Sequence, residues 1–308
     1  MMADAAALVA MTLDAVIVAV SQGRPRLLVV DEPGQPPALP SGPLDVERDA
    51  TLELGLRRWV RSRTGLEVGY VEQLYTFGDR DRRPDAGPQR QVSVGYLALV
   101  EETEPPLDAR WVDVYALLPW EDQRDPEPGP EEAAIRAALE VWTVQGADAD
   151  VRRERAERVA VNFGPPWDGI RALERYELLY GAHLLPEWAR DTGAPPPGID
   201  TGIALRFDHR RIAATALSRL RGKLTYRPVV FELLPERFSL LELQHTVEAL
   251  AGITLHKQNF RRLVERSGLV EGTGQRARSQ AGRPAELFRF RPSVQRERPR
   301  PGVGVPYR

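Results

Sequence analysis

The first third of the chain alternates short apolar runs with turns, a pattern typical of β-strands. Two of these runs, residues 12–20 and 26–30, flank Gln22-Gly23 and predict a β-hairpin. Apolar side chains at helical spacing then predict a helix that ends before Gly65. That helix and two further strands are expected at residues 49–64, 69–77 and 91–100. The pattern predicts an α+β domain over residues 1–119.

Helical spacing replaces the strand pattern after residue 119. An acidic, Pro-rich linker is expected at residues 121–130, and helices are expected at residues 131–145, 149–159 and 168–179. One more helix, residues 207–224, carries Ile212, Leu217 and Leu220 on its apolar side. We therefore expect a helical insertion at residues 120–205 and a connecting helix at residues 206–225.

The last apolar pattern has the order helix, turn, Arg-rich helix and Gly-rich basic hairpin. The two helices are expected at residues 239–251 and 256–267, and the hairpin at residues 269–291. This order is typical of a winged helix-turn-helix that lies on DNA. Residues 226–292 are thus expected to form a DNA-binding domain, and residues 293–308 a disordered tail.

Charge and cysteine usage narrow the function further. Residues 221–308 hold 17 Lys and Arg against 8 Asp and Glu, although the whole chain has a net charge of −2. A basic end on an acidic body predicts a polyanion partner for that end. The chain has no cysteine, which excludes disulfides and thiolate metal sites. No apolar run of membrane-spanning length and no leader pattern occur, so we expect a cytoplasmic protein.

The second helix of the basic end offers side chains for contacts with double-stranded DNA. We expect Phe260, Leu263 and Val264 to face the core, which leaves Lys257, Gln258, Asn259, Arg261 and Arg262 to face DNA. In the hairpin, Arg276, Arg278 and Arg283 are expected to clamp phosphates. Two alternatives stay open. Arg261 or Arg262 can pair with Glu265 or Glu248 instead, and Asn259 can serve as a local cap.

Residues 39–66 resemble the Nudix box, a loop, helix and loop in which Glu side chains hold divalent metal on a diphosphate. With Gly65 and Leu66 as anchors, Arg58 and Val60 keep their types. The Glu positions of the box core instead hold Trp59, Ser62 and Arg63, and Gly42 matches the opening Gly only with two extra residues. Metal-dependent hydrolysis is therefore expected to be lost, with no catalytic or metal-ligating residues.

Residues 74–100, with Tyr-Thr-Phe-Gly-Asp followed by Ser-Val-Gly-Tyr-Leu-Ala-Leu, closely resemble the Nudix-related transcriptional regulators of NAD metabolism. The Phe-Asp-His of residues 207–209, Arg-Gly-Lys-Leu of 221–224, Phe-Glu-Leu-Leu-Pro-Glu of 231–236 and Asn-Phe-Arg-Arg of 259–262 continue the match. The resemblance covers about residues 11–119 and 206–291, and its helical insertion is similar to that of the longer members. It implies an α+β fold: a Nudix-like domain with a helical insertion, followed by a winged helix-turn-helix domain.

The resemblance further implies a homodimeric repressor of NAD-biosynthesis genes whose effector is ADP-ribose or a related NAD-derived nucleotide, with no other cofactor. Nudix-like folds hold a diphosphate near the box and the loop that follows residue 77, so we expect a ligand set of Arg58, Tyr75, Phe77, Arg80, Arg82 and Arg90. Two other interpretations stay open: an active nucleotide pyrophosphatase with an accessory domain, and an adaptor whose basic end binds RNA.

Overall fold

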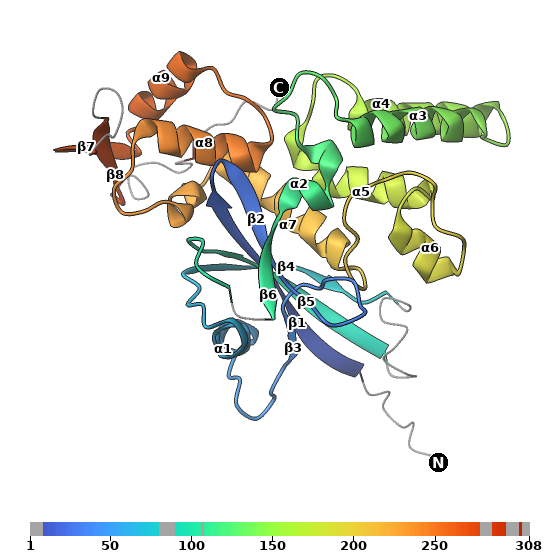
Figure 1. Cartoon of the computed structure of the whole chain (residues 1–308), viewed down its shortest axis with the longest axis horizontal. Helices are drawn as coiled ribbons and strands as arrows, with labels where there is room; N and C mark the ends of the chain where they lie inside the picture. Colours follow the sequence, from blue (N-terminus) through green and yellow to red (C-terminus); the bar gives the residue numbers. More distant parts are fainter. Residues whose placement is uncertain (1–8, 80–89, 106–107, 278–284, 294–301, 304–308) are drawn as a thin grey trace, which may run out of the picture.

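The strands of residues 9–113 form a mixed β-sheet, which lies below α7 and α8 in Figure 1. This sheet and the helices that cover it are called the front domain. The computed structural model describes residues 9–79, 90–105, 108–277, 285–293 and 302–303. Within these residues the strands run in the order β4-β5-β1-β2-β6, with β3 also paired to β1. Only the β1–β5 pair is parallel. The strands are β1 (Val9–Ser21), β2 (Arg24–Val30), β3 (Ser41–Pro43), β4 (Tyr70–Phe77), β5 (Arg90–Leu99) and β6 (Ala109–Asp113).

The predicted β1–β2 hairpin is confirmed. Gln22 and Gly23 both have positive φ, +50° and +68°. That conformation suits a two-residue turn whose twist matches the flanking strands. The register places Val18 opposite Leu27. The hairpin therefore carries its turn to the end of the sheet that faces the C-terminal domain (Figure 1).

Helices cover both faces of this sheet. The predicted box helix, α1 (Leu52–Thr64), begins at Thr51, whose hydroxyl caps Leu54 N, and ends at the left-handed Gly65. It packs against Leu13 and Ile17 of β1. The opposite face is covered by α7 (His209–Leu224), which meets Val16 and Val18 because strand side chains alternate.

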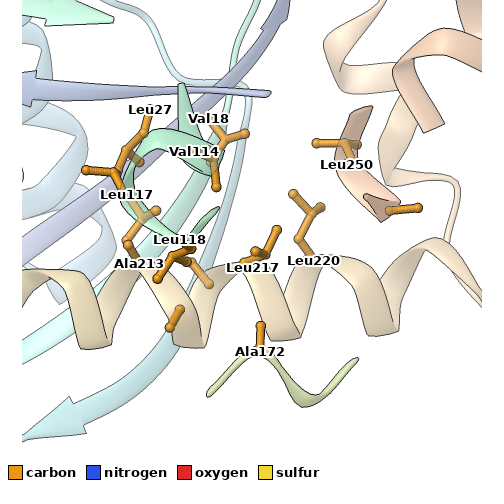
Figure 2. Packing of buried hydrophobic residues seen from close by; sticks show 14 of the residues in the cluster. Val18, Leu27, Val114, Leu117, Leu118, Ala172, Ala213, Leu217, Leu220 and Leu250 are labelled. Carbon is orange, nitrogen blue, oxygen red and sulfur yellow. The ribbon is translucent and has the colours of Figure 1, made fainter. Parts of the chain in front are cut away.

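Helix α7 is therefore more than the expected connector. Figure 2 shows Ala213, Leu217 and Leu220 of α7 gathered with Val18 and Leu27 of the sheet. Burying each leucine contributes about 1.5–3 kcal/mol. Although it is separated by the whole insertion in sequence, α7 completes the front domain as its second helical layer.

After the short helix α2, the insertion, which lies wholly within the described residues, forms four α-helices, of which α5 lies beside α7 (Figure 1). Helices α3 and α4 form a hairpin, while α5 packs against α7. The predicted helices occur with shifted ends, and α6 was not predicted. The elements of this region are α2 (Val114–Leu117), α3 (Pro130–Val144), α4 (Ala149–Phe163), α5 (Ala172–Gly181) and α6 (Pro186–Thr192). No helix among the described residues is long and apolar enough to cross a bilayer.

The linker expected at residues 121–130 is wrong at its first residue. Trp120 and Glu121 are fully buried, and Glu121 binds two arginines from other helices. Composition favoured an exposed segment, because the following residues are acidic and Pro-rich. Instead the carboxylate lies in the core, where ion pairs with residues distant in sequence offset the cost of its burial.

The C-terminal domain contains α8 (Leu240–Ala251), α9 (Lys257–Ser267), β7 (Val270–Arg276) and β8 (Glu286–Phe290), as expected. The two strands are antiparallel and form the wing. The tail prediction is wrong at Gly302 and Val303. The Val303 N–H donates to Leu224 O at 2.9 Å, and its side chain is buried at the end of α7.

Candidate functional site

The first helix of the C-terminal domain, α8, is fixed at both ends. At its start, Ser239 and Glu242 form a reciprocal capping box. Along its length, Leu243, Val247 and Leu250 enter the core. At its end, Gly252 adopts φ +69°, a left-handed conformation that glycine accepts without strain. The chain then turns toward α9.

The second helix, α9, presents a polar face that was predicted from its spacing. Phe260 and Val264 are buried, and Leu263 is partly buried against the same core. The side chains expected to face DNA are all exposed on this helix: Lys257, Gln258, Asn259, Arg261 and Arg262. Because they lie on one short helix, they can enter a major groove together.

Arg261 forms a long ion pair with Glu265, one of the two partners that were left open from the sequence. Its Nε lies 3.7 Å from Glu265 Oε1, and both side chains are more than half exposed. Exposed pairs of this kind contribute about 0–1 kcal/mol, so the pair leaves Arg261 able to exchange partners. Glu248 is engaged elsewhere, since it accepts from Gln244 and from Leu255 N.

A groove separates the two helices from the wing. It has a volume of about 470 Å³, and Lys257, Arg261 and Arg276 line it from α9 and from the end of β7. Arg276 is exposed at the end of β7. Arg278 and Arg283 lie outside the described residues. The structure thus brings helix and wing cations to one groove, whose charge suits a phosphate backbone.

In the segment that resembles the Nudix box, an aromatic side chain packs on a glycine. The indole of Trp59 lies directly over Gly42 on β3, where a Cβ at residue 42 would fall 1.9 Å from Trp59 Nε1. This contact places Gly42 of β3 directly against α1. Trp59 is the residue that the sequence comparison aligned with a Glu position of the box.

Arg58, expected to hold a diphosphate, is already paired. Its Nε and Nη2 each donate to the Asp49 carboxylate at 2.8 Å. The guanidinium lowers the pKa of Asp49 by hydrogen bonding to the carboxylate. A ligand phosphate would therefore have to displace a bidentate ion pair before it could bind Arg58.

The other expected ligand residues do not all lie together. Tyr75 is 66% exposed, whereas Phe77 is only 8% exposed and packs on the α7 face of the sheet, opposite α1. The two rings meet edge to face at 5.7 Å. Arg90 donates to Gly78 O at 2.7 Å. Arg80 and Arg82 fall outside the described residues. Phe77 thus cannot stack on a base near α1 in this conformation.

A buried polar cluster that was not predicted from the sequence lies where β1 meets the start of α7. Asp14 is fully buried and accepts hydrogen bonds from Ser41, at 2.5 Å, and from Ser93. His209 Nδ1 accepts from Leu39 N at 2.9 Å, and its Nε2 lies 3.9 Å from Asp14. A carboxylate in an inward-facing strand position was the available signal, because buried charges need partners.

The backbone beside this cluster is strained. Phe207 has φ +56°, a region that bulky side chains rarely adopt. Its neighbour Arg206 donates to Glu32 at 2.7 Å and joins the start of α7 to the loop after β2. Strained residues of this kind concentrate at functional sites. The cluster and the strained residue beside it therefore lie together where β1 meets the start of α7.

Known proteins match both halves of the chain. Residues 230–290 match the model of the NrtR DNA-binding winged helix domain. Over 284 residues the chain is 25% identical to the ADPR responsive transcriptional repressor NtrR of Acinetobacter baylyi. The aligned region covers 91% of this chain and 81% of that relative.

The crystal structure of Shewanella oneidensis NrtR complexed with a 27mer DNA matches with a TM-score of 0.57 and 23% identity, over 92% of this chain and 94% of that one. A MutT/nudix family protein from Enterococcus faecalis matches with a TM-score of 0.55 and 16% identity, over 94% and 90%. The expected fold, a Nudix-like domain followed by a winged helix, is confirmed.

Proposed function

We propose that this chain, which has the organisation of a Nudix-related transcriptional regulator, is a DNA-binding repressor of NAD-biosynthesis or salvage genes. The observation that carries the proposal is the winged helix itself. Its exposed α9 cations and its basic groove form a single surface suited to duplex DNA. An RNA-binding adaptor would not need this arrangement of helix and wing.

The effector in this proposal is ADP-ribose or a related nucleotide. The relative from Acinetobacter baylyi is described as responsive to ADPR, and the front domain shares the Nudix-like fold. Tyr75, Arg80, Arg82 and Arg90 remain the proposed ligand residues, and Arg58 joins them only if it leaves Asp49. Binding of the nucleotide releases the DNA. A homodimer is part of the proposal, because two heads on paired half-sites multiply the few contacts of one head.

The front domain, in the same proposal, binds its nucleotide without cleaving it. Trp59 fills the space over Gly42, and the other two Glu positions of the box core hold Ser62 and Arg63. A guanidinium at such a position repels Mg²⁺ where a carboxylate would attract it. The alternative, an active nucleotide pyrophosphatase, requires a carboxylate set from elsewhere in the chain.

One titration tests both the release of DNA by ADP-ribose and the absence of ADP-ribose hydrolysis. A fluorescent duplex is first selected from a random-sequence library on the purified protein, and its anisotropy is then followed as ADP-ribose is added with Mg²⁺. We expect the anisotropy to fall as DNA is released, while AMP in the same sample stays at the level of a protein-free control. AMP that rises in proportion to protein concentration would support the pyrophosphatase instead.

A further inference from the structure

A short segment after the front domain, Glu121–Arg124, runs alongside the turn between α8 and α9. The Gln123 N–H donates to Gly252 O at 2.7 Å, and Gln123 forms a parallel bridge with Ile253. The Thr254 hydroxyl donates to Arg124 O at 2.9 Å. The turn that sets the direction of α9 is thus hydrogen-bonded to main chain that lies more than 100 residues earlier.

The same segment is tied to the sheet by Arg124. Its guanidinium donates to both oxygens of Asp122, at 2.7 and 2.6 Å, and to Gly23 O in the β1–β2 turn at 2.6 Å. It also lies over the Tyr115 ring, 5.1 Å from the ring centroid. A shift of the hairpin turn would therefore move Arg124, whose carbonyl holds Thr254.

The last turn of α8 is capped by side chains from outside the C-terminal domain. A helix end leaves carbonyls without intrahelical partners. Here the Tyr115 hydroxyl donates to Ala249 O at 2.6 Å, and Arg221 Nε of α7 donates to Leu250 O at 3.0 Å. Since Arg221 is cationic, it also complements the negative end of the helix dipole.

Glu121 holds these groups in one orientation. Its fully buried carboxylate accepts from Arg221 and from Arg175 of α5, the latter at 2.6 and 2.8 Å. Arg221 also donates to Glu121 O at 2.9 Å. The carbonyl of Glu121 lies so close to Gly252 that a Cβ there would fall 2.3 Å from it. Directional hydrogen bonds of this kind fix a rotation, which apolar contacts alone would not.

We infer that Glu121–Arg124, together with Tyr115 and Arg221, is a positioning element that orients the α8–α9 turn relative to the front sheet and conveys nucleotide binding to the DNA-reading helix. The DNA-reading role of α9 and the nucleotide response rest on the proposed function. The residues of the positioning element belong neither to the proposed DNA surface nor to the proposed nucleotide site. They act through the place and tilt of α9.

Two mild substitutions separate positioning from folding. Arg124→Gln removes the contacts to Gly23 and Asp122, and Thr254→Val removes one exposed hydroxyl without changing shape. The matched control is Arg110→Gln, which breaks the exposed Arg110–Asp31 pair on the edge of the sheet. For each protein the affinity for the selected duplex and for random duplex is measured by anisotropy, with and without ADP-ribose.

We expect both variants to lose affinity for the selected duplex by about 2- to 10-fold, the scale of one or two hydrogen bonds, while random duplex is bound unchanged. Contacts with base edges require the correct tilt of α9, whereas contacts with phosphates still form when that tilt changes. The factor by which ADP-ribose weakens binding should fall in parallel. The Arg110→Gln protein should match the wild type in both respects.

Each outcome decides one claim. If the Arg124→Gln protein keeps its preference for the selected duplex within twofold, the positioning element is refuted. If the preference falls but the wild type itself does not respond to ADP-ribose, the orienting role stands, and the effector assignment and the signal relay fail. If the wild type responds and both variants respond equally, the relay of nucleotide binding through this segment is refuted.

Discussion

Replacing Glu121 by alanine should destabilise the protein by about 3–5 kcal/mol, the largest single effect that we expect. The substitution leaves Arg175 and Arg221 buried without their shared carboxylate, and the cost of an unpaired buried charge is high. Urea unfolding followed by circular dichroism measures the change. Glu53→Ala, which removes an exposed pair with Arg57, is the control and should cost less than about 1 kcal/mol.

The Glu121 carboxylate should also contribute to the pH dependence of the free energy of unfolding in acid. Burial alone would raise the pKa of Glu121, but Arg175 and Arg221 hold it below its ordinary value. A lowered pKa means that the carboxylate contributes stability above an unfolded-state pKa of about 4.3 and loses that contribution as the pH falls through the folded pKa. The alanine variant should lack this part of the pH dependence. A variant within 1 kcal/mol of the wild type at neutral pH would contradict the buried ion-pair assignment.

Replacing Arg262 by alanine should weaken binding to the selected duplex by about 1–3 kcal/mol and leave random duplex nearly unchanged, because a base contact carries sequence information. Arg276→Ala should instead weaken both duplexes alike and make the dependence on salt shallower, as expected for a phosphate contact. Anisotropy titrations across a series of salt concentrations separate the two effects.

The control for these variants is Arg153→Ala on α4, which lies in the insertion, outside the winged helix. Its ion pair with Asp150, at 3.0 Å, is exposed at the surface and contributes little to stability. Its DNA affinity should equal that of the wild type. If the Arg276 variant loses selectivity while the Arg262 variant keeps it, the roles of helix and wing are reversed.

Local signals in the sequence account for the elements that were predicted correctly. Gln22-Gly23 marks the hairpin turn, Thr51 and Gly65 bound α1, and Gly252 ends α8. Each of these acts within a few residues of chain. The polar face of α9 could also be predicted from a local signal, because helical spacing separates buried Phe260 from its exposed neighbours.

Long-range contacts account for what was missed. Glu121 looked like part of an acidic linker, since its two arginine partners lie 54 and 100 residues further along the chain. Helix α7 looked like a connector, since nothing local shows that it covers the sheet. Phe77 was grouped with Arg58 by family pattern, yet strand alternation and α7 place it on the other face. The candidate effector site was therefore less predictable than the DNA surface.

In the proposed function, one chain binds a nucleotide and DNA at two separate sites, and each ligand weakens the binding of the other. Linkage requires that two such ligands weaken each other by the same factor, which is typically about 5- to 150-fold. Calorimetric titration of ADP-ribose into the protein alone, and into the protein saturated with the selected duplex, measures that factor. We expect ADP-ribose to bind the DNA complex more weakly than the free protein, by the same factor with which ADP-ribose weakens DNA binding. Equal affinity for ADP-ribose in both titrations, or no binding in either, would contradict it.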